Sequence, residues 1–580
     1  MTRPAFLKSR AGARWLLTFI VASTICFVIY VYRSDANHIF LQSLLPDTDT
    51  DPSTHSEQDQ TSTLSPEDPS SPPGALLPAQ HTRPPWISTP AVFDTTKVPG
   101  YVAPSSSSLP DRPLALHPLL SSAMANFLSR PVLTHSQATP QNEAACPRSQ
   151  LNSQVNADQL AGEQASWVSV DAERIVAMRR GALEYLEGHS AAEGEDALVG
   201  PGRGHDGQSV VRGSRGVVLA AGNHRTVDKA IVCIREMKKL GWRDVVDGGI
   251  EVFHFEGEMT DDGQRRQLEE LGVTVRMVST KKAPGQWKNF ELKAESILRS
   301  SFDEVLYLDS DNFPLSNPAD LFESRLFRDP AGGNAVFWPD LNRDHPDNAI
   351  HRLLGIPCHE AWELDSGQVL IAKSGNGGLN LAALYLAQYM AEDGSYWFSG
   401  GDKDTFLLLL VYALTPHSRY AFLALGIPYT PAPRWLSLLG NLDRRNDNFC
   451  GAAMLQYGLS PPRPGSADPS DPSHPPPLFV HANLLKHQGG VRPGGVFTLL
   501  RRLSPLQDDV RAEYAPATAL HSVAGSGKAV AGRGLCSEIR AFRGGAEVET
   551  VDARGAFGGA MEGLEEEYFG YPGTRPGVWR

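Results

Sequence analysis

Apolar residues along residues 150–500 take up helical spacing and strand-like spacing in turn. Residues 170–188 are amphipathic at helical spacing, residues 216–222 form an apolar run that ends in glycine, and residues 226–241 are again helical. The alternation continues with strand-like segments at 250–255, 273–278 and 303–311 and with helical segments at 261–272 and 287–301. Repeated βα units predict an α/β fold with a mostly parallel sheet flanked by helices, in which ligands bind beyond the carboxyl ends of the strands.

A second apolar pattern lies near the start of the chain. Residues 15–32 contain no charge and as a helix would be about 27 Å long, enough to cross a thin bilayer. Four basic residues precede this segment, which places residues 1–14 in the cytosol and the rest of the chain across the membrane. A cleaved signal peptide is the competing interpretation, but its apolar core would be overlong. We expect a single-pass type II anchor, short enough for the thin membranes of the early secretory pathway, and hence a Golgi membrane protein.

Composition divides the remainder into three parts. Residues 33–150 are rich in Pro, Ser and Thr and are expected to form a disordered lumenal stem. Residues 151–500 are expected to be the globular domain, and residues 501–580 a Gly-rich C-terminal extension. The net charge of -13 argues against a nucleic-acid partner, which would require a basic surface.

The six cysteines show no metal-binding or redox spacing, because no C-x-x-C pair occurs. Cys26 lies in the apolar segment, so at most two disulfides can form within the rest of the chain. Cys233 lies on an apolar helical face and is expected to be a buried thiol. The pairing of Cys146, Cys358, Cys450 and Cys536 stays open.

The most informative stretch is a buried strand that ends in two acids, Asp309 and Asp311. Once the strand breaks, both carboxylates can turn toward one point, where their repulsion favours a divalent cation. Carboxylate ligands suit Mn²⁺ or Mg²⁺, which complete their coordination with phosphate oxygens and water. The alternative is an Asp-rich turn with solvated acids, and for an isolated D-x-D it is the commoner case.

Six segments in order resemble one family: 251–258, 290–322, 335–341, 362–374, 400–406 and 479–487. The chain resembles the fungal Golgi α-mannosyltransferases of glycosyltransferase family 71 across about residues 215–490. The resemblance implies a Rossmann-like GT-A fold with a mixed, mostly parallel sheet. It also implies retaining transfer of mannose from GDP-mannose to the mannose chains of glycoproteins, with an α-1,2 linkage favoured over α-1,3.

The resemblance also implies a ligand set. Asp309 and Asp311 would hold Mn²⁺ against the donor diphosphate. His481 would be the third metal ligand and Lys486 a phosphate contact, although His487 competes with His481 for the first role.

Two clusters of polar residues are candidates for contact with the sugar. Glu363, Asp365 and Gln368 could stabilise an oxocarbenium-like transition state, or could belong to a polar turn before a strand. Asp402 and Asp404 could bind sugar hydroxyls, or could complement the dipole of the helix that they begin.

Other residues are expected near the nucleotide or the sugar. Ala220, Gly222 and Arg225 follow the first strand and would meet the nucleoside, while Lys293 would reach the diphosphate or remain an exposed helical lysine. Trp338 with Asp340 could form a sugar platform, although a core tryptophan is the commoner case.

Three alternative functions follow from the same residues. The donor could be another nucleotide sugar, because a D-x-D reads the diphosphate and not the base. A dehalogenase-type phosphatase also ends a strand in D-x-D, but the Gly-Thr that usually follows its nucleophile is missing here. A non-catalytic lumenal protein with a decayed site is the third, which the presence of all the candidate acids disfavours.

Overall fold

The structure is a computed structural model of the chain. It describes residues 91–104, 108–147, 164–279, 291–359, 362–392, 414–434, 436–442, 449–459, 476–483, 485, 495–503, 520–524, 537–541, 548–557 and 563–570. All of these belong to one compact unit, Thr82–Arg580. Within the described part, no helix is both long and apolar enough to cross a membrane. The anchor predicted at residues 15–32 lies outside this part, as do residues 33–90 of the predicted stem.

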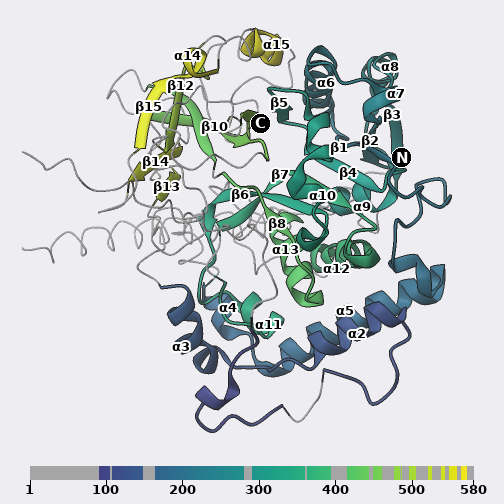
Figure 1. The fold of residues 1–580 in the computed structure, drawn as a ribbon, viewed down its shortest axis with the longest axis vertical. Helices are drawn as coiled ribbons and strands as arrows, with labels where there is room; N and C mark the ends of the chain where they lie inside the picture. Colours follow the sequence, from purple (N-terminus) through teal and green to yellow (C-terminus); the bar gives the residue numbers. More distant parts are fainter. Residues whose placement is uncertain are drawn as a thin grey trace, which may run out of the picture. The chain divides into compact units, whose positions relative to one another are not determined.

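The central feature is a seven-stranded sheet with the strand order β3-β2-β1-β4-β7-β6-β8 (Figure 1). The four strands β1 to β4 pair in parallel, as does β8 with β6, whereas β7 runs antiparallel to both β4 and β6. The predicted mixed, mostly parallel sheet is therefore confirmed. The strands are β1 (Arg215–Ala220), β2 (Gly249–Phe255), β3 (Thr274–Val278), β4 (Glu304–Asp309), β6 (Ala335–Arg343), β7 (Trp362–Ala372) and β8 (Thr430–Pro431).

Helices cover both faces of this sheet. Successive residues of a strand point to opposite sides, so each strand contributes apolar side chains to both faces. On β1, Val217 and Leu219 pack in the core that contains α6, whereas Val218 packs in the core that contains α9. Helices α5, α12 and α13 share the α9 side (Figure 1). The helices named here are α5 (Ala172–Glu193), α6 (His224–Lys239), α9 (Glu291–Arg299), α12 (Leu379–Glu392) and α13 (Leu414–Leu425).

The local elements agree with the apolar pattern. The predicted strands and helices between residues 216 and 309 all form, and α8 (Asp262–Glu270) lies between β2 and β3. Helix α6 begins after Asn223, whose side chain accepts hydrogen bonds from the backbone N–H groups of Arg225 and Thr226. The shorter helices are α4 (Gln164–Ser169), α7 (Asp244–Asp247), α10 (Arg325–Arg328) and α11 (Ala349–Leu354).

A second, eight-stranded sheet packs beside the α6 face and supplies one side of the candidate site. Its pairings among the described strands are antiparallel, and β11 bridges β10 to the short β5. Its strands are β5 (Asn312–Pro314), β9 (Ser437–Leu442), β10 (Phe449–Tyr457), β11 (Pro477–His481), β12 (Leu499–Leu503), β13 (Leu520–Ala524), β14 (Ser537–Ala541) and β15 (Val548–Asp552). The βα alternation gave no indication of this sheet.

Residues 108–147, which we call the N-terminal arm, fall in the range expected to be stem but form α2 (Pro118–Leu128) and α3 (His135–Ala145). Leu120, Met124 and Phe127 of α2 are buried in the core on the α9 side. A disulfide between Cys146 and Cys358 joins the end of this arm to the segment after α11.

The C-terminal range expected to be an extension also contributes ordered elements. Helices α14 (Ala553–Phe557) and α15 (Leu564–Gly570) follow β15, and Tyr568 and Phe569 of α15 are buried in the core on the α6 side. Folded structure therefore extends beyond residues 151–500 in both directions.

The cysteines agree with the predictions of a buried Cys233 thiol and of at most two disulfides. Cys233 is buried and free, and it donates a hydrogen bond to the backbone carbonyl of Asn312. Cys450 is disulfide-bonded in addition to the Cys146–Cys358 pair.

Candidate metal centre

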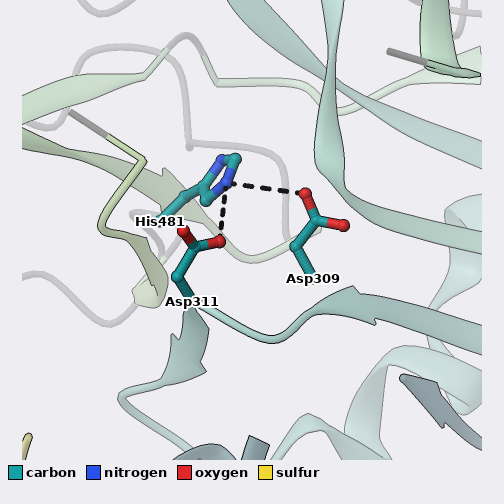
Figure 2. A group of neighbouring side chains, drawn as sticks. All are labelled: Asp309, Asp311 and His481. Carbon is teal, nitrogen blue, oxygen red and sulfur yellow. Dashed lines mark ion pairs between the residues drawn. The ribbon is translucent and has the colours of Figure 1, made fainter. Parts of the chain in front are cut away.

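The two acids and the histidine that the sequence singled out lie together. Asp309, Asp311 and His481 each offer one ligand atom, and these atoms all lie within 4.8 Å of one another. His481 Nε2 is 3.8 Å from Asp309 Oδ2 and 3.5 Å from Asp311 Oδ1, and Figure 2 shows the imidazole edge directed at both carboxylates. In the described part of the chain, no other group of histidines, cysteines and acids is arranged in this way.

Strand pairing explains how residues so distant in sequence meet. Asp309 is the last residue of β4, and the chain then turns into β5, which pairs with β11 so that Asn312 stands opposite His481. The backbone N–H of Ala482 donates a hydrogen bond to the carbonyl of Asp311 over 2.9 Å. The cluster therefore lies where the carboxyl end of a parallel strand meets the edge of the second sheet, the position at which α/β sheets bind ligands.

The imidazole of His481 is held from behind by Asp365 of β7. Its Nδ1 lies 3.0 Å from Asp365 Oδ1, and both side chains are buried. A carboxylate on Nδ1 fixes the tautomer and leaves Nε2 as the ligand atom, which is the usual arrangement behind a metal-binding histidine. Gly367 makes room for this ring, because a Cβ there would lie 2.5 Å from His481 Nδ1.

Asp365 has no lone pair left for a sugar. Besides His481, it accepts hydrogen bonds from the Gly367 N–H and from the side-chain amides of Gln368 and Gln456. Four donors fill the four lone-pair directions of one carboxylate. Gln368 is fully buried and accepts from the Asn312 amide, so both residues support the metal ligands from behind. The structure does not bring Asp365 or Gln368 into the sugar-contacting position expected from sequence.

The protonation of this pair follows from its surroundings. Burial by itself lowers the pKa of His481, but Asp365 and Asp311 outweigh it and raise that pKa well above the usual value. Burial by itself raises the pKa of Asp365, but His481 and the hydrogen bonds from Gly367 and Gln368 bring that pKa below the usual value. The raised pKa of His481 favours the charged imidazole, so a metal ion that used Nε2 would have to displace its proton.

Two lysines pair with the candidate metal-binding carboxylates. Lys293 Nζ donates to Asp309 Oδ2 over 2.6 Å and to the Ser366 hydroxyl over 3.1 Å, while Lys229 Nζ donates to Asp311 Oδ2 over 3.0 Å. Lys293 was expected either near the diphosphate or as an exposed helical lysine; it is largely buried and paired with Asp309, and its contact with a diphosphate stays a prediction. Lys229 was not expected from sequence. It reaches the site from α6, the helix that follows β1, and β1 is the direct neighbour of β4 in the sheet.

Tyr307 completes the set around Asp309. Its hydroxyl donates to Asp309 Oδ1 over 2.7 Å, and burial together with the charge of Asp309 raises the pKa of the phenol well above the usual value. The phenol therefore stays protonated and remains a hydrogen-bond donor to the ligand carboxylate.

The residues expected near the nucleotide lie at the same edge of the sheet. Ala220 is the β1 residue opposite Asp309 in the parallel register, and Arg225 lies in the first turn of α6. Gly222 is buried and lies against Glu258, since a Cβ there would be 1.9 Å from Glu258 Oε2. The side chain of Glu258 therefore covers the Cα of Gly222 on the side where a Cβ would project.

The remaining candidates lie in different surroundings. Glu363 is buried in β7. The pKa of Tyr420 is raised by burial, by the charge of Asp344 and to a smaller extent by that of Glu363. Trp338 is a core residue, the commoner of the two interpretations of the sequence: its ring is fully buried, donates to the Tyr457 carbonyl and packs against Phe479, so it forms no sugar platform. Asp340 is partly buried in β6. The predicted residues Asp402, Asp404, Lys486 and the competing His487 lie outside the described residues.

The donor set fits a hard divalent cation. Two carboxylates and one imidazole are ligands that Mn²⁺ accepts readily, and Mg²⁺ takes the carboxylates with water in the remaining positions. The carboxylate behind His481 supplies the outer support that such a ligand set requires.

Comparison with known proteins agrees with these features. A family model described as "Mannosyltransferase putative" matches residues 214–355, which include Asp309 and Asp311. Alpha-1,2-mannosyltransferase MNN21 of Candida albicans is 28% identical over 216 residues, covering 30% of this chain and 30% of the relative. Alpha-1,2-mannosyltransferase MNN22 of the same organism is 25% identical over 291 residues, covering 42% and 46%. The resemblance to the fungal α-mannosyltransferases is thereby confirmed, although each of these alignments spans less than half of the relative.

Solved structures share a smaller likeness. The galactosyltransferase LgtC, solved with donor and acceptor sugar analogues, is 14% identical, covers 37% of this chain and 73% of its own, and has a TM-score of 0.25.

Proposed function

We propose that this protein is a metal-dependent, retaining α-mannosyltransferase of GT-A type that transfers mannose from GDP-mannose to the mannose chains of glycoproteins. The observation that carries the proposal is the meeting of Asp309, Asp311 and His481 at the carboxyl edge of the sheet, with both acids inside the segment that matches the mannosyltransferase family. The names of the relatives favour an α-1,2 over an α-1,3 linkage.

The candidate residues have separate tasks in this proposal. Asp309, Asp311 and His481 would hold Mn²⁺ or Mg²⁺, and such an ion when bound neutralises the charge that grows on the leaving diphosphate. Asp365 keeps Nε2 of His481 turned toward the two carboxylates. Lys293 lies close enough to Asp309 to reach an anionic group bound beside it. Glu363 stays the candidate for stabilising positive charge on the sugar, and Asp402 and Asp404 stay candidates for its hydroxyls.

The proposed location is the Golgi membrane, with the catalytic domain in the lumen. The disulfide between Cys146 and Cys358 supports an oxidising compartment, because such bonds are rare in the cytosol. The uncharged segment at residues 15–32, with basic residues before it, supports a type II anchor.

The test is release of nucleoside diphosphate by the purified full chain with Mn²⁺, with GDP-mannose compared against UDP-sugars and with mannobiose as acceptor. We expect turnover of GDP-mannose that EDTA abolishes, and no turnover by a variant that carries both Asp309→Asn and Asp311→Asn. Preferential turnover of a UDP-sugar would replace the donor assignment. No EDTA-sensitive turnover of any nucleotide sugar would favour the non-catalytic alternative and reject the enzyme.

A further inference from the structure

The two metal-binding carboxylates are each paired with a lysine, and the lysines come from opposite faces of the sheet. Lys229 belongs to α6, whose apolar residues pack on one face, and Lys293 belongs to α9, whose apolar residues pack on the other. Both side chains are largely buried, with 9% and 12% of their surface exposed. The two ammonium groups therefore sit on either side of one small acidic site.

This arrangement makes the metal-free site nearly neutral. Asp309 and Asp311 carry two negative charges, Lys229 and Lys293 carry two positive charges, and the charge of Asp365 faces the His481 imidazole. A divalent cation that binds Asp309 and Asp311 alone must enter beside two ammonium groups at short range. In a partly buried site such repulsion is poorly screened, so the metal alone is held weakly.

A nucleoside diphosphate changes that balance. Its phosphate oxygens can complete the coordination of the metal and at the same time accept hydrogen bonds from ammonium groups displaced from the carboxylates. A lysine can make this exchange with small movements, because its charge lies at the end of a flexible four-carbon chain. The same two side chains then oppose the metal when it binds alone and favour it when the diphosphate is present.

We propose that Lys229 is a diphosphate-binding residue of the donor site and that, with Lys293, it makes the binding of metal and nucleoside diphosphate mutually dependent. In the empty site its Nζ takes the place of a cation on Asp311, and in the loaded site it contacts the diphosphate. This inference rests on the proposed function, because it requires that Asp311 bind a metal and that the ligand carry a diphosphate.

The decisive variant is Lys229→Met, which removes the charge and keeps most of the chain length. We expect Mn²⁺ alone to bind about tenfold more tightly than in the wild type, because even strongly screened repulsion between a divalent ion and a nearby ammonium group has this effect. We expect GDP, titrated in excess Mn²⁺, to bind about tenfold more weakly. A residue with only a structural role would move both affinities in the same direction or neither.

Two further variants serve as controls. Lys238→Met removes another ion-paired lysine of α6, the partner of Asp244, and should leave both affinities at the wild-type value. Lys229→Arg keeps the charge and should retain weak binding of Mn²⁺ alone. Calorimetric titration of the full chain, purified in detergent, gives both affinities, and thermal unfolding shows whether each variant is folded.

The outcomes separate the inference from the function on which it rests. If the wild type binds Mn²⁺ and GDP but Lys229→Met changes neither affinity, or weakens both, the coupling role is wrong and the proposed function stands. If the wild type binds neither, both are wrong. Should Lys229→Met not fold, the wild type still decides, since equal affinity for Mn²⁺ with and without GDP would overturn the coupling.

Discussion

Replacing Asp365 with asparagine tests the support behind the metal ligands most directly. The substitution keeps the shape of the side chain but removes its charge and one of its two acceptor oxygens. Four donors now converge on Asp365, from His481, Gly367, Gln368 and Gln456. An asparagine oxygen can accept from two of them, so two buried donors would lose their acceptor and the imidazolium would lose its counter-charge.

The structure gives the size of the effect by two routes. Two unsatisfied buried donors cost about 1–3 kcal/mol each, and breaking a buried ion pair by removing one partner costs about 3–5 kcal/mol. We therefore expect Asp365→Asn to lower the free energy of unfolding by about 3–5 kcal/mol. Because the ring orientation and the basicity of His481 also depend on this carboxylate, Mn²⁺ affinity should fall about 10- to 100-fold.

The assay pairs urea unfolding in EDTA with calorimetric titration of Mn²⁺. Asp303→Asn is the matched control, because Asp303 is also a buried carboxylate with several donors, from Gly213 and Ser374, but lies before the opposite end of β4. The control should lose stability and keep its Mn²⁺ affinity. An Asp365→Asn protein that binds Mn²⁺ as tightly as the wild type would refute the supporting role of Asp365.

Three further predictions concern the same cluster. Asp309→Asn and Asp311→Asn should each abolish sugar transfer while the thermal unfolding temperature changes little, and transfer retained by both variants would remove them from the metal site. Gly367→Ala should weaken Mn²⁺ binding in a folded protein, because its Cβ would occupy the place of the His481 ring; unchanged binding would show that the ring can lie elsewhere. In EDTA, the stability contributed by the His481–Asp365 pair should be complete between the ordinary pKa values of Asp and His. It should decline as the pH rises through the raised pKa of His481 or falls through the lowered pKa of Asp365. Urea unfolding across pH checks this, and a wild-type profile equal to that of Asp365→Asn would contradict it.

The part of the site that depends on local sequence could be predicted. A run of buried residues ending in Asp309 and Asp311 defines a strand and its carboxyl end, so the placement of both acids follows from apolar spacing alone. His481 was expected from the family resemblance, and the structure brings it to the two acids through the pairing of β5 with β11. That pairing joins segments far apart in the chain, which periodicity cannot reveal.

The rest depended on tertiary contacts. Asp365 was a candidate for sugar contact because a cluster of Glu363, Asp365 and Gln368 could stabilise positive charge on a sugar, but β7 turns its side chain toward His481 and the surrounding amides. Lys229 reads as one of several lysines on an amphipathic helix, and only the position of α6 beside the end of β4 shows that it reaches Asp311. Trp338 is a simpler case, because a core tryptophan was already the commoner interpretation of the sequence, and its full burial agrees with that interpretation.

The disulfide between the N-terminal arm and the segment after α11 has a consequence for the order of folding during synthesis. Cys146 and Cys358 are 212 residues apart in sequence. At about 5–20 residues per second, Cys146 leaves the ribosome roughly 10 to 40 s before its partner. Throughout that interval α12 and α13 have not yet been synthesised, so Leu120, Met124 and Phe127 of α2 lack part of the core into which they pack, and the thiol of Cys146 is open to other cysteines. During this period, folding factors in the compartment that receives the nascent chain must keep the arm soluble and the Cys146 thiol unpaired.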